Sequence, residues 1–461
     1  MKKVVALLLA STLVFSMVAC SNGKSDTKET PKETAGESQS VEDSSSADNS
    51  VSGGDPENAE LSFAWWGNQV RTDNTTAACD YYITQHPGIS IEYMPFQWSD
   101  YWTKLATDAA GNNLPDLIQQ DYAYIAQFVE SDDLLDLTPY IESGVLDVSN
   151  ISDNILETGK SADGKIVALC AGVNAPSLIY NKTLTDSLGI EVPDNMTWAQ
   201  FAEISAEIYE KSGVRTQYGY GNSENPLTYY IRSKGYSQFF EDDKLAYDDA
   251  SVMVEYYQRL VDGVNEGWLM DAATLSGLDT TSIEQNPLIY YSDPQYGSWC
   301  SASFSNQLSA FQTAAPKGTK LAITCWPSDD PAASNYMKPS QFFSVTTDTK
   351  NPDAAVQLLN ALMNDVEVNK LLAAERGIPA SSVVVEALSP DLSPENQLVV
   401  TYLNEVVEKN SSAIFPPLAN KTSEVINGPI QEIAEKVLFG EMTAEDAAEE
   451  LFTRGNEIMG R

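Results

Sequence analysis

The fold is decided by a stretch that opens with Leu61-Ser62-Phe63-Ala64-Trp65-Trp66. This apolar run predicts a strand, and the pattern that follows predicts a helix over residues 75–85. Next come an alternating strand over 89–93, a helix over 98–110 and a short apolar run over 114–118. This order of strand, helix, strand, helix and strand indicates a mainly parallel sheet with helices on both faces.

Ligands of such sheets gather at the carboxyl ends of the strands, so the residues just after each strand are candidate binding residues. The aromatic and polar residues at these positions are Trp66, Asn68, Arg71, Gln97, Asp121 and Tyr122. Consecutive strand side chains point to opposite faces, so one of Trp65 and Trp66 must face the core. We expect Trp66 to face the ligand and Trp65 the core. For Asn68 and Arg71, simple solvation in the loop is the alternative.

The remaining sequence predicts a second α/β unit after the segment 164–169. Thr197 and Gln200 fit a capping box at the start of a helix, and Asn351-Pro352 predicts another helix start. A last acidic helix is expected over 443–459. About 400 residues are too many for one core, which favours two lobes. We expect the first lobe to comprise 61–172 plus 334–383, and the second to comprise 173–333 plus 384–461.

The first twenty residues have the pattern of an export signal. Two lysines precede a short apolar run, and Met17-Val18-Ala19-Cys20 has the form of a lipobox. We therefore expect residues 1–19 to be a lipoprotein signal peptide and Cys20 to carry diacylglycerol, with ordinary secretion as the alternative. Residues 20–60 contain no aromatic side chain and are expected to form a disordered tether. The mature protein should then lie lipid-anchored on the extracytoplasmic face of the cell membrane.

Charge and composition exclude several functions. The formal net charge is −39, which leaves no basic stripe for nucleic acid and disfavours strongly anionic ligands. His86 is the only histidine, so Ser/His/Asp and Cys/His catalytic sites are not expected. None of the cysteines stands in a CxxC arrangement, which argues against zinc. Buried free thiols are expected, with a Cys300–Cys325 disulfide as the alternative.

The segment Gly164-Lys165-Ile166-Val167-Ala168-Leu169 with the later Leu178-Ile179-Tyr180-Asn181-Lys182 resembles the first crossover of maltose-binding-protein-like solute-binding proteins of ABC transporters. The order of the other motifs after the lipobox, including Leu114-Pro115-Asp116-Leu117 and Leu134-Leu135-Asp136-Leu137-Thr138, supports this resemblance. The resemblance implies a two-lobed α/β periplasmic-binding-protein fold (type II), with a mainly parallel sheet in each lobe. It also implies a sugar held between lobes that close on it, and a closed form that docks on a membrane permease. No cofactor or metal is implied, and we expect a monomer.

The resemblance also suggests roles for particular residues. Asn174 takes the place of a hinge-strand acid that contacts sugar hydroxyls, and its change to an amide argues against maltose itself. Trp299 lies where the second lobe presents a stacking floor, and Trp326 follows a strand just before the return crossover. Asp121 and Tyr122 lie where the family places an acid and an aromatic. Arg376 is either a ligand-binding residue or a helix-end cation that interacts with the helix dipole.

The residues themselves also favour a carbohydrate. Sugar rings need flat aromatic surfaces beside planar donors and acceptors, and the chain has 8 Trp and 22 Tyr, several of them at strand ends. Trp98, Trp102, Trp198 and Trp268 are expected in the core. The expected function is therefore non-enzymatic capture of a neutral saccharide for an ABC importer. A lipid-anchored glycan-processing enzyme, or a peptide or iron binder of the same fold, remains the alternative.

Overall fold

The computed structural model describes residues 58–122, 124–218, 226–241, 243–278, 282–414 and 422–460. The expected signal peptide, the lipidated Cys20 and almost all of the expected tether lie outside these residues. Within the described ranges, no helix combines the length and the apolar character needed to cross a bilayer.

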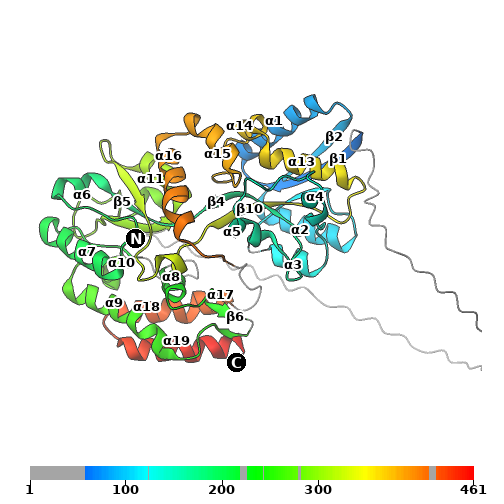
Figure 1. The fold of residues 1–461 in the computed structure, drawn as a ribbon. Helices are drawn as coiled ribbons and strands as arrows, with labels where there is room; N and C mark the ends of the chain where they lie inside the picture. The colour runs from blue at the N-terminus through cyan, green and yellow to red at the C-terminus, as the bar shows by residue number, and fades with distance from the viewer. Residues whose placement is uncertain are drawn as a thin grey trace, which may run out of the picture. The chain divides into compact units, whose positions relative to one another are not determined.

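The first sheet has five strands in the order β2-β1-β3-β10-β4 (Figure 1). The strands are β1 (Ala59–Trp66), β2 (Ile89–Phe96), β3 (Leu117–Gln120), β4 (Leu169–Asn174) and β10 (Lys338–Val345). As predicted, β1 pairs in parallel with β2 and β3. The strand β10, which comes from far along the sequence, is antiparallel to both of its neighbours.

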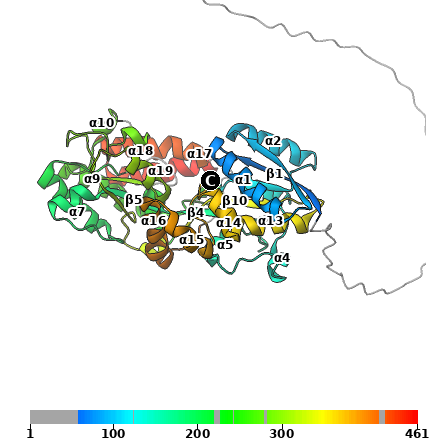
Figure 2. The same ribbon diagram turned by 90° about the horizontal axis from the view of Figure 1, so that it is seen from above.

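Helices from the same segments of the chain flank this sheet. They are α1 (Gln69–Gln85), α2 (Trp98–Ala110), α3 (Ile125–Glu130), α4 (Thr138–Glu142), α5 (Asp153–Leu156), α13 (Pro352–Asn364), α14 (Val366–Leu372) and α15 (Ser382–Leu388). The first helix begins earlier than the predicted residue 75, because the side chain of Asn68 caps it by accepting a hydrogen bond from Arg71 N. The predicted start at Asn351-Pro352 is confirmed, and α13 packs beside α1 (Figure 2).

The second sheet differs from the expected parallel arrangement. It contains β5 (Pro176–Asn181), β8 (Cys300–Phe304) and β9 (Leu321–Thr324), and β5 pairs antiparallel with both outer strands. The expectation of a mainly parallel sheet in the second lobe was therefore wrong for these three strands. The reason is that β5 arrives directly from the first sheet, while β8 and β9 run back toward the first sheet. A small hairpin, β6 (Phe240–Glu241) and β7 (Lys244–Leu245), lies apart from this sheet.

Helices make up most of the remaining structure. The α-helices are α6 (Lys182–Leu188), α7 (Trp198–Ser212), α8 (Pro226–Ser233), α9 (Val254–Glu266), α10 (Ala272–Leu275), α11 (Leu308–Ala314), α12 (Pro331–Ser334), α16 (Pro394–Thr401), α17 (Thr422–Val425), α18 (Gln431–Leu438) and α19 (Ala444–Met459). Two π-helical turns are η6 (Tyr402–Val407) and η8 (Ile426–Ile430). Single 3₁₀ turns are η1 (Glu157–Gly159), η2 (Ala250–Met253), η3 (Ile283–Gln285), η4 (Ser305–Gln307), η5 (Ser389–Asp391) and η7 (Glu408–Asn410). The predicted capping box at Thr197 and the last helix are confirmed, and α18 and α19 pack on α9 (Figure 1).

The chain passes between the two sheets in short segments. Only Ala175 separates β4 from β5, and residues 325–337 return the chain from β9 to β10. A third passage leads from α15, which packs on α14, to α16, which packs on α11. Asn174, Lys338 and Asn396, which lie next to these passages, border the cavity described below.

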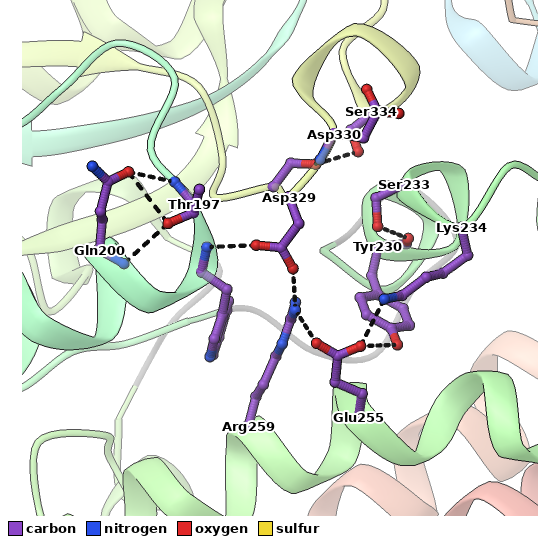
Figure 3. A network of polar contacts seen from close by, with 12 residues as sticks. Thr197, Gln200, Tyr230, Ser233, Lys234, Glu255, Arg259, Asp329, Asp330 and Ser334 are labelled. Carbon is purple, nitrogen blue, oxygen red and sulfur yellow. Dashed lines mark hydrogen bonds and ion pairs between the residues drawn. The ribbon is translucent and has the colours of Figure 1, made fainter.

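A polar network holds the return passage to the helices of the second sheet (Figure 3). Asp329 accepts a hydrogen bond from Trp198 N at 3.3 Å and forms an ion pair with Arg259. Arg259 also donates to Glu255 at 2.6 Å, and its guanidinium lies 5.1 Å from the ring centres of both Trp198 and Tyr230. The network therefore ties the segment after β9 to α7, α8 and α9.

Cys79, Cys170, Cys300 and Cys325 are all buried free thiols. The alternative of a Cys300–Cys325 disulfide is wrong, because β5 lies between the strands that carry or precede these residues. Strands two apart in a sheet are separated by roughly 10 Å, whereas a disulfide needs Cα atoms within about 7 Å. Burial raises the pKa of Cys79 and Cys170 to about 12.

Candidate functional site

A cavity of about 560 Å³ lies where elements of the two sheets meet. The first-sheet side supplies Arg71, Asp121, Tyr122, Asn174, the β10 residues Lys338 to Gln341 and the loop residues Ala374 to Ile378. The other side supplies Phe304, Asn306, Gln307 and Ser309 near the end of β8, together with Asn396 and Val399 of α16. The volume falls within the range of small-molecule sites, and most of the lining side chains are polar.

Five predicted binding residues come together at this cavity: Arg71, Asp121, Tyr122, Asn174 and Arg376. They come from four separate segments of the chain, and the sheet topology brings these segments to one edge, as expected for carboxyl ends of strands. Whether these residues contact a ligand remains a prediction.

Asn174 is the most informative of these residues. It ends β4, is buried, and its side-chain oxygen has no hydrogen-bond partner among the described residues. A buried carboxamide oxygen without a partner costs about 1–3 kcal/mol, so its position at a cavity points to a donor that arrives from a bound molecule.

Arg71 is held by several acceptors at the rim of the cavity. It forms an ion pair with Glu375, and its Nη1 donates to Trp66 O at 3.2 Å. The amide of Gln341, oriented with its oxygen toward Arg71, accepts at 2.9 and 3.1 Å. This arrangement fixes the guanidinium and neutralises its charge, which suits recognition of an uncharged ligand.

Arg376 contributes differently, because its side chain extends into the core. It donates to Gln119 Oε1 at 2.8 Å and to Thr75 Oγ1 at 2.9 Å, and it lies 5.3 Å from the ring centre of Phe343. Burial, assisted by the nearby charge of Arg71, lowers the pKa of Arg376 to about 9. Its guanidinium supports the sheet edge rather than meeting the helix dipole, which was the alternative from sequence.

The loop that contains Arg376 is pressed against β4. Val173 N donates to Ile378 O at 2.7 Å, and Ser340 Oγ donates to Gly172 O at 2.8 Å. A Cβ atom at Gly172 would lie 2.4 Å from Arg376 O, so only glycine permits this approach. The loop and the passing strand therefore form one wall of the cavity.

Two predicted stacking residues lie in the core instead of the cavity, and both expectations are corrected. Trp299 is fully buried and its Nε1 donates to Thr216 Oγ1 at 2.8 Å. It precedes β8, whereas the other end of that strand, Phe304, reaches the cavity roughly 17 Å away at the usual rise per residue. Trp326 is also buried, with its Nε1 donating to Ser177 O at 2.8 Å.

Three further predicted residues do not line the cavity. The side chain of Asn68 is occupied as the α1 cap, and Gln97 is an exposed residue just before α2. Trp66 is buried in contact with the rings of Trp98 and Trp102, while Trp65 is fully buried as expected.

The sequence reasoning missed several lining residues, including Phe304, Asn306, Gln307, Lys338 and Glu375. Phe304 ends the alternating run 300–304 and the amides of Asn306 and Gln307 come after it, so the strand-end rule that selected Asp121 could have found them. Lys338, whose Nζ lies 4.7 Å from the ring centre of Phe304, begins a strand and carries no such signal. No group of three or more His, Cys, Asp or Glu side chains suited to a metal occurs in the described part of the chain.

The remaining tryptophans divide between core and surface. Trp268 is buried as expected, but Trp98 is 43% exposed, so its expected core position was wrong. Consecutive tyrosines at 229–230 and 290–291 are the residues behind the iron-binding alternative. Tyr229 is buried and its hydroxyl donates to Asn335, and burial raises its pKa, which opposes the phenolate that iron requires.

Comparison with known proteins gives a consistent result. Residues 77–397 match the family described as bacterial extracellular solute-binding protein. The Escherichia coli (strain K12) protein YcjN, named as an ABC transporter periplasmic-binding protein, is 22% identical over 192 residues, which are 38% of this chain and 42% of that protein. The chain thus matches less than half the length of this curated relative.

Two solved structures match almost throughout. One is an extracellular solute-binding protein family 1 member from Alicyclobacillus acidocaldarius, with a TM-score of 0.78 and 25% identity over 88% of this chain and 99% of that one. The other is a periplasmic oligogalacturonide binding protein from Yersinia enterocolitica, with a TM-score of 0.72 and 21% identity over 87% and 99%. The family model over residues 77–397 covers most of the chain, and the two sheets and the cavity agree with it, so the chain belongs to the bacterial extracellular solute-binding protein family.

Proposed function

We propose that this protein captures a neutral saccharide in the cavity at Asn174 and delivers it to the permease of an ABC importer, without catalysing a reaction. The observation that carries the proposal is Asn174, which lines a cavity bordered by polar groups from both sheets and whose buried side-chain oxygen has no partner in the described structure. The binding of oligogalacturonide by a structural relative supports a carbohydrate as the ligand class.

The chemistry of the lining fits a sugar. Hydroxyl groups both donate and accept hydrogen bonds, so they can satisfy the Asn174 oxygen and also meet the amides of Asn306, Gln307 and Asn396. The rings of Tyr122 and Phe304 supply apolar faces for the C–H surface of a pyranose.

Binding should couple to closure of the two lobes. A ligand that touches residues of both sheets has more contacts when they approach, so it favours the closed state by population shift. We propose the lobe boundaries predicted from sequence, 61–172 plus 334–383 and 173–333 plus 384–461, with the bending at the short passages. Small-angle scattering at saturating ligand should show a smaller radius of gyration, and an unchanged radius would remove closure from the mechanism.

We further propose that the protein acts as a monomer, anchored outside the cytoplasmic membrane by lipid on Cys20. The lipobox pattern supports the anchor, and Cys20→Ser should move the protein from the membrane fraction to the soluble fraction. Retention of this variant in the membrane fraction would mean that something other than the lipid holds the protein.

The central test is a binding experiment on two asparagine variants. Asn174→Leu removes the unpaired acceptor at the cavity, whereas Asn364→Leu removes an asparagine whose oxygen also lacks a described partner but which lies on α13, away from the cavity. A thermal-shift screen of mono- and oligosaccharides identifies the ligand, since a ligand at 100 times its Kd adds about 2.7 kcal/mol to the stability of the folded state.

Calorimetric titration should then show that only Asn174→Leu weakens saccharide binding. Equal affinities for both variants, or no saccharide that raises Tm, would refute the proposal. Cleavage of an oligosaccharide by the purified protein would instead favour the glycan-processing alternative.

A further inference from the structure

An aromatic cluster beside the cavity has no place in the function described so far. Trp98, the first residue of α2, lies on the surface with 43% of its area exposed. Its ring is held edge to face by three others, with centroid distances of 5.1 Å to Trp66, 5.4 Å to Trp102 and 5.7 Å to Tyr124. We call these four residues the aromatic shelf.

The exposed ring of Trp98 is supported by the other rings of the shelf. Trp102 and Tyr124 stack at 4.0 Å with their planes only 9° apart, and Trp66 is buried beneath Trp98 and Trp102. A tryptophan supported in this way loses little conformational entropy when a flat ligand covers it. Large apolar rings left exposed on a preformed support are typical of binding surfaces.

The shelf is continuous with the cavity through the backbone. The carbonyl of Trp66 accepts the hydrogen bond from Arg71, which lines the cavity, and Tyr124 N donates to the carbonyl of the lining residue Asp121 at 3.0 Å. The turns after β1 and β3 therefore carry cavity residues and shelf residues together. The shelf therefore lies next to the side of the cavity that Arg71 and Asp121 line.

On the basis of the proposed function, we infer that the aromatic shelf is a second saccharide subsite outside the cavity, so that the ligand is an oligosaccharide with one end in the cavity and a later unit stacked on Trp98. A sugar is the occupant that the shelf fits, because a pyranose offers an apolar face to the Trp98 ring and hydroxyls to neighbouring polar groups. The neighbouring Gln97 is exposed and makes no capping hydrogen bond to α2.

The test compares ligands of different length on one pair of variants. Gluco-, manno-, xylo- and galacto-oligosaccharides of one to six units are titrated calorimetrically against the full protein, Trp98→Ala and Tyr290→Ala. Tyr290 is the matched control, because it is 58% exposed and does not line the cavity. Trp98→Ala should leave the affinity for the shortest binding members unchanged and weaken the longer members roughly three- to tenfold. Trp98→Phe should recover part of this loss.

A spectroscopic readout separates stacking from indirect effects. The difference in emission between the full protein and Trp98→Phe reports on Trp98 alone, and it should shift to the blue only with the longer members. An equal loss at every length, or no loss at any length, would overturn the inference while leaving capture in the cavity intact. A change of oligomeric state in Trp98→Ala would assign the shelf to a second copy of the chain. Failure of every saccharide to bind the unaltered protein would overturn the proposed function itself, and this inference with it.

Discussion

Substitution of Gly172 by alanine tests the close contact between β4 and the loop after α14. The added Cβ would lie 2.4 Å from Arg376 O, 3.0 Å from its carbonyl carbon and 3.1 Å from the carbonyl carbon of Gly377. All three atoms belong to the backbone, so no side chain can rotate away. The loop must move by nearly 1 Å, which weakens the hydrogen bond between Val173 N and Ile378 O.

The size of the effect follows from these two costs. Overpacking of this kind costs about 1–3 kcal/mol, and a lost backbone hydrogen bond costs about 0.5–1.5 kcal/mol. We therefore expect Gly172→Ala to lower the free energy of unfolding in urea by about 2–4 kcal/mol. Ligand affinity should fall as well, because the displaced loop carries Glu375, Arg376 and Gly377 at the cavity.

Gly277→Ala is the matched control. Gly277 is exposed, has no left-handed φ, and its added Cβ would lie an ordinary 3.6 Å from Thr274 O. This variant should stay within about 0.5 kcal/mol of the unaltered protein. If Gly172→Ala behaved like Gly277→Ala in both stability and ligand affinity, the described packing of the loop on β4 would be refuted.

Three other predictions concern parts of the molecule away from this contact. Burial raises the pKa of Cys79 and Cys170 to about 12, so these thiols stay protonated in the folded state at pH values where the unfolded chain has lost their protons. Their contribution to stability should be fully present below about pH 9 and should be lost as the pH rises toward 12. The lowered pKa of Arg376 has the opposite effect on stability over this pH range, but Arg376 is one group against two thiols. Equal urea midpoints at about pH 8 and pH 10.5 would therefore contradict the expectation. Trp299→Ala should cost about 3–5 kcal/mol of stability and leave saccharide affinity unchanged; selective loss of affinity would return Trp299 to the binding site. Arg259→Met should lower stability by about 1–2 kcal/mol, and a double-mutant cycle with Asp329→Asn that shows no coupling would argue against the ion pair.

The sequence predicted the first sheet well, because its first three strands alternate with helices and local patterns define each element. The same logic located Arg71 and Asp121 at one edge, since strand ends converge wherever the strands are parallel, whereas Asn174 was found from the family resemblance. It failed for the second sheet, where antiparallel pairing depends on where β5 comes from, and this is not encoded in any one strand.

Errors at single residues have a common cause. Trp299 and Trp98 are both tryptophans beside an element boundary, yet one is fully buried and the other is exposed. The difference is set by residues distant in sequence, such as Thr216 for Trp299 and Tyr124 for Trp98. Local patterns define elements, whereas the face that a boundary residue presents is decided by tertiary packing.

The position of β10 has a consequence for when the protein can fold. Phe343 in this strand pairs with both Gln119 and Leu169, so an inner strand of the first sheet is supplied more than two hundred positions after β3. At about 5–20 residues per second, roughly 10–45 s of synthesis separate the two strands. Until β10 arrives, β3 and β4 have no common neighbour and the sheet cannot close. Completion of the first sheet must therefore wait until most of the chain has been synthesised.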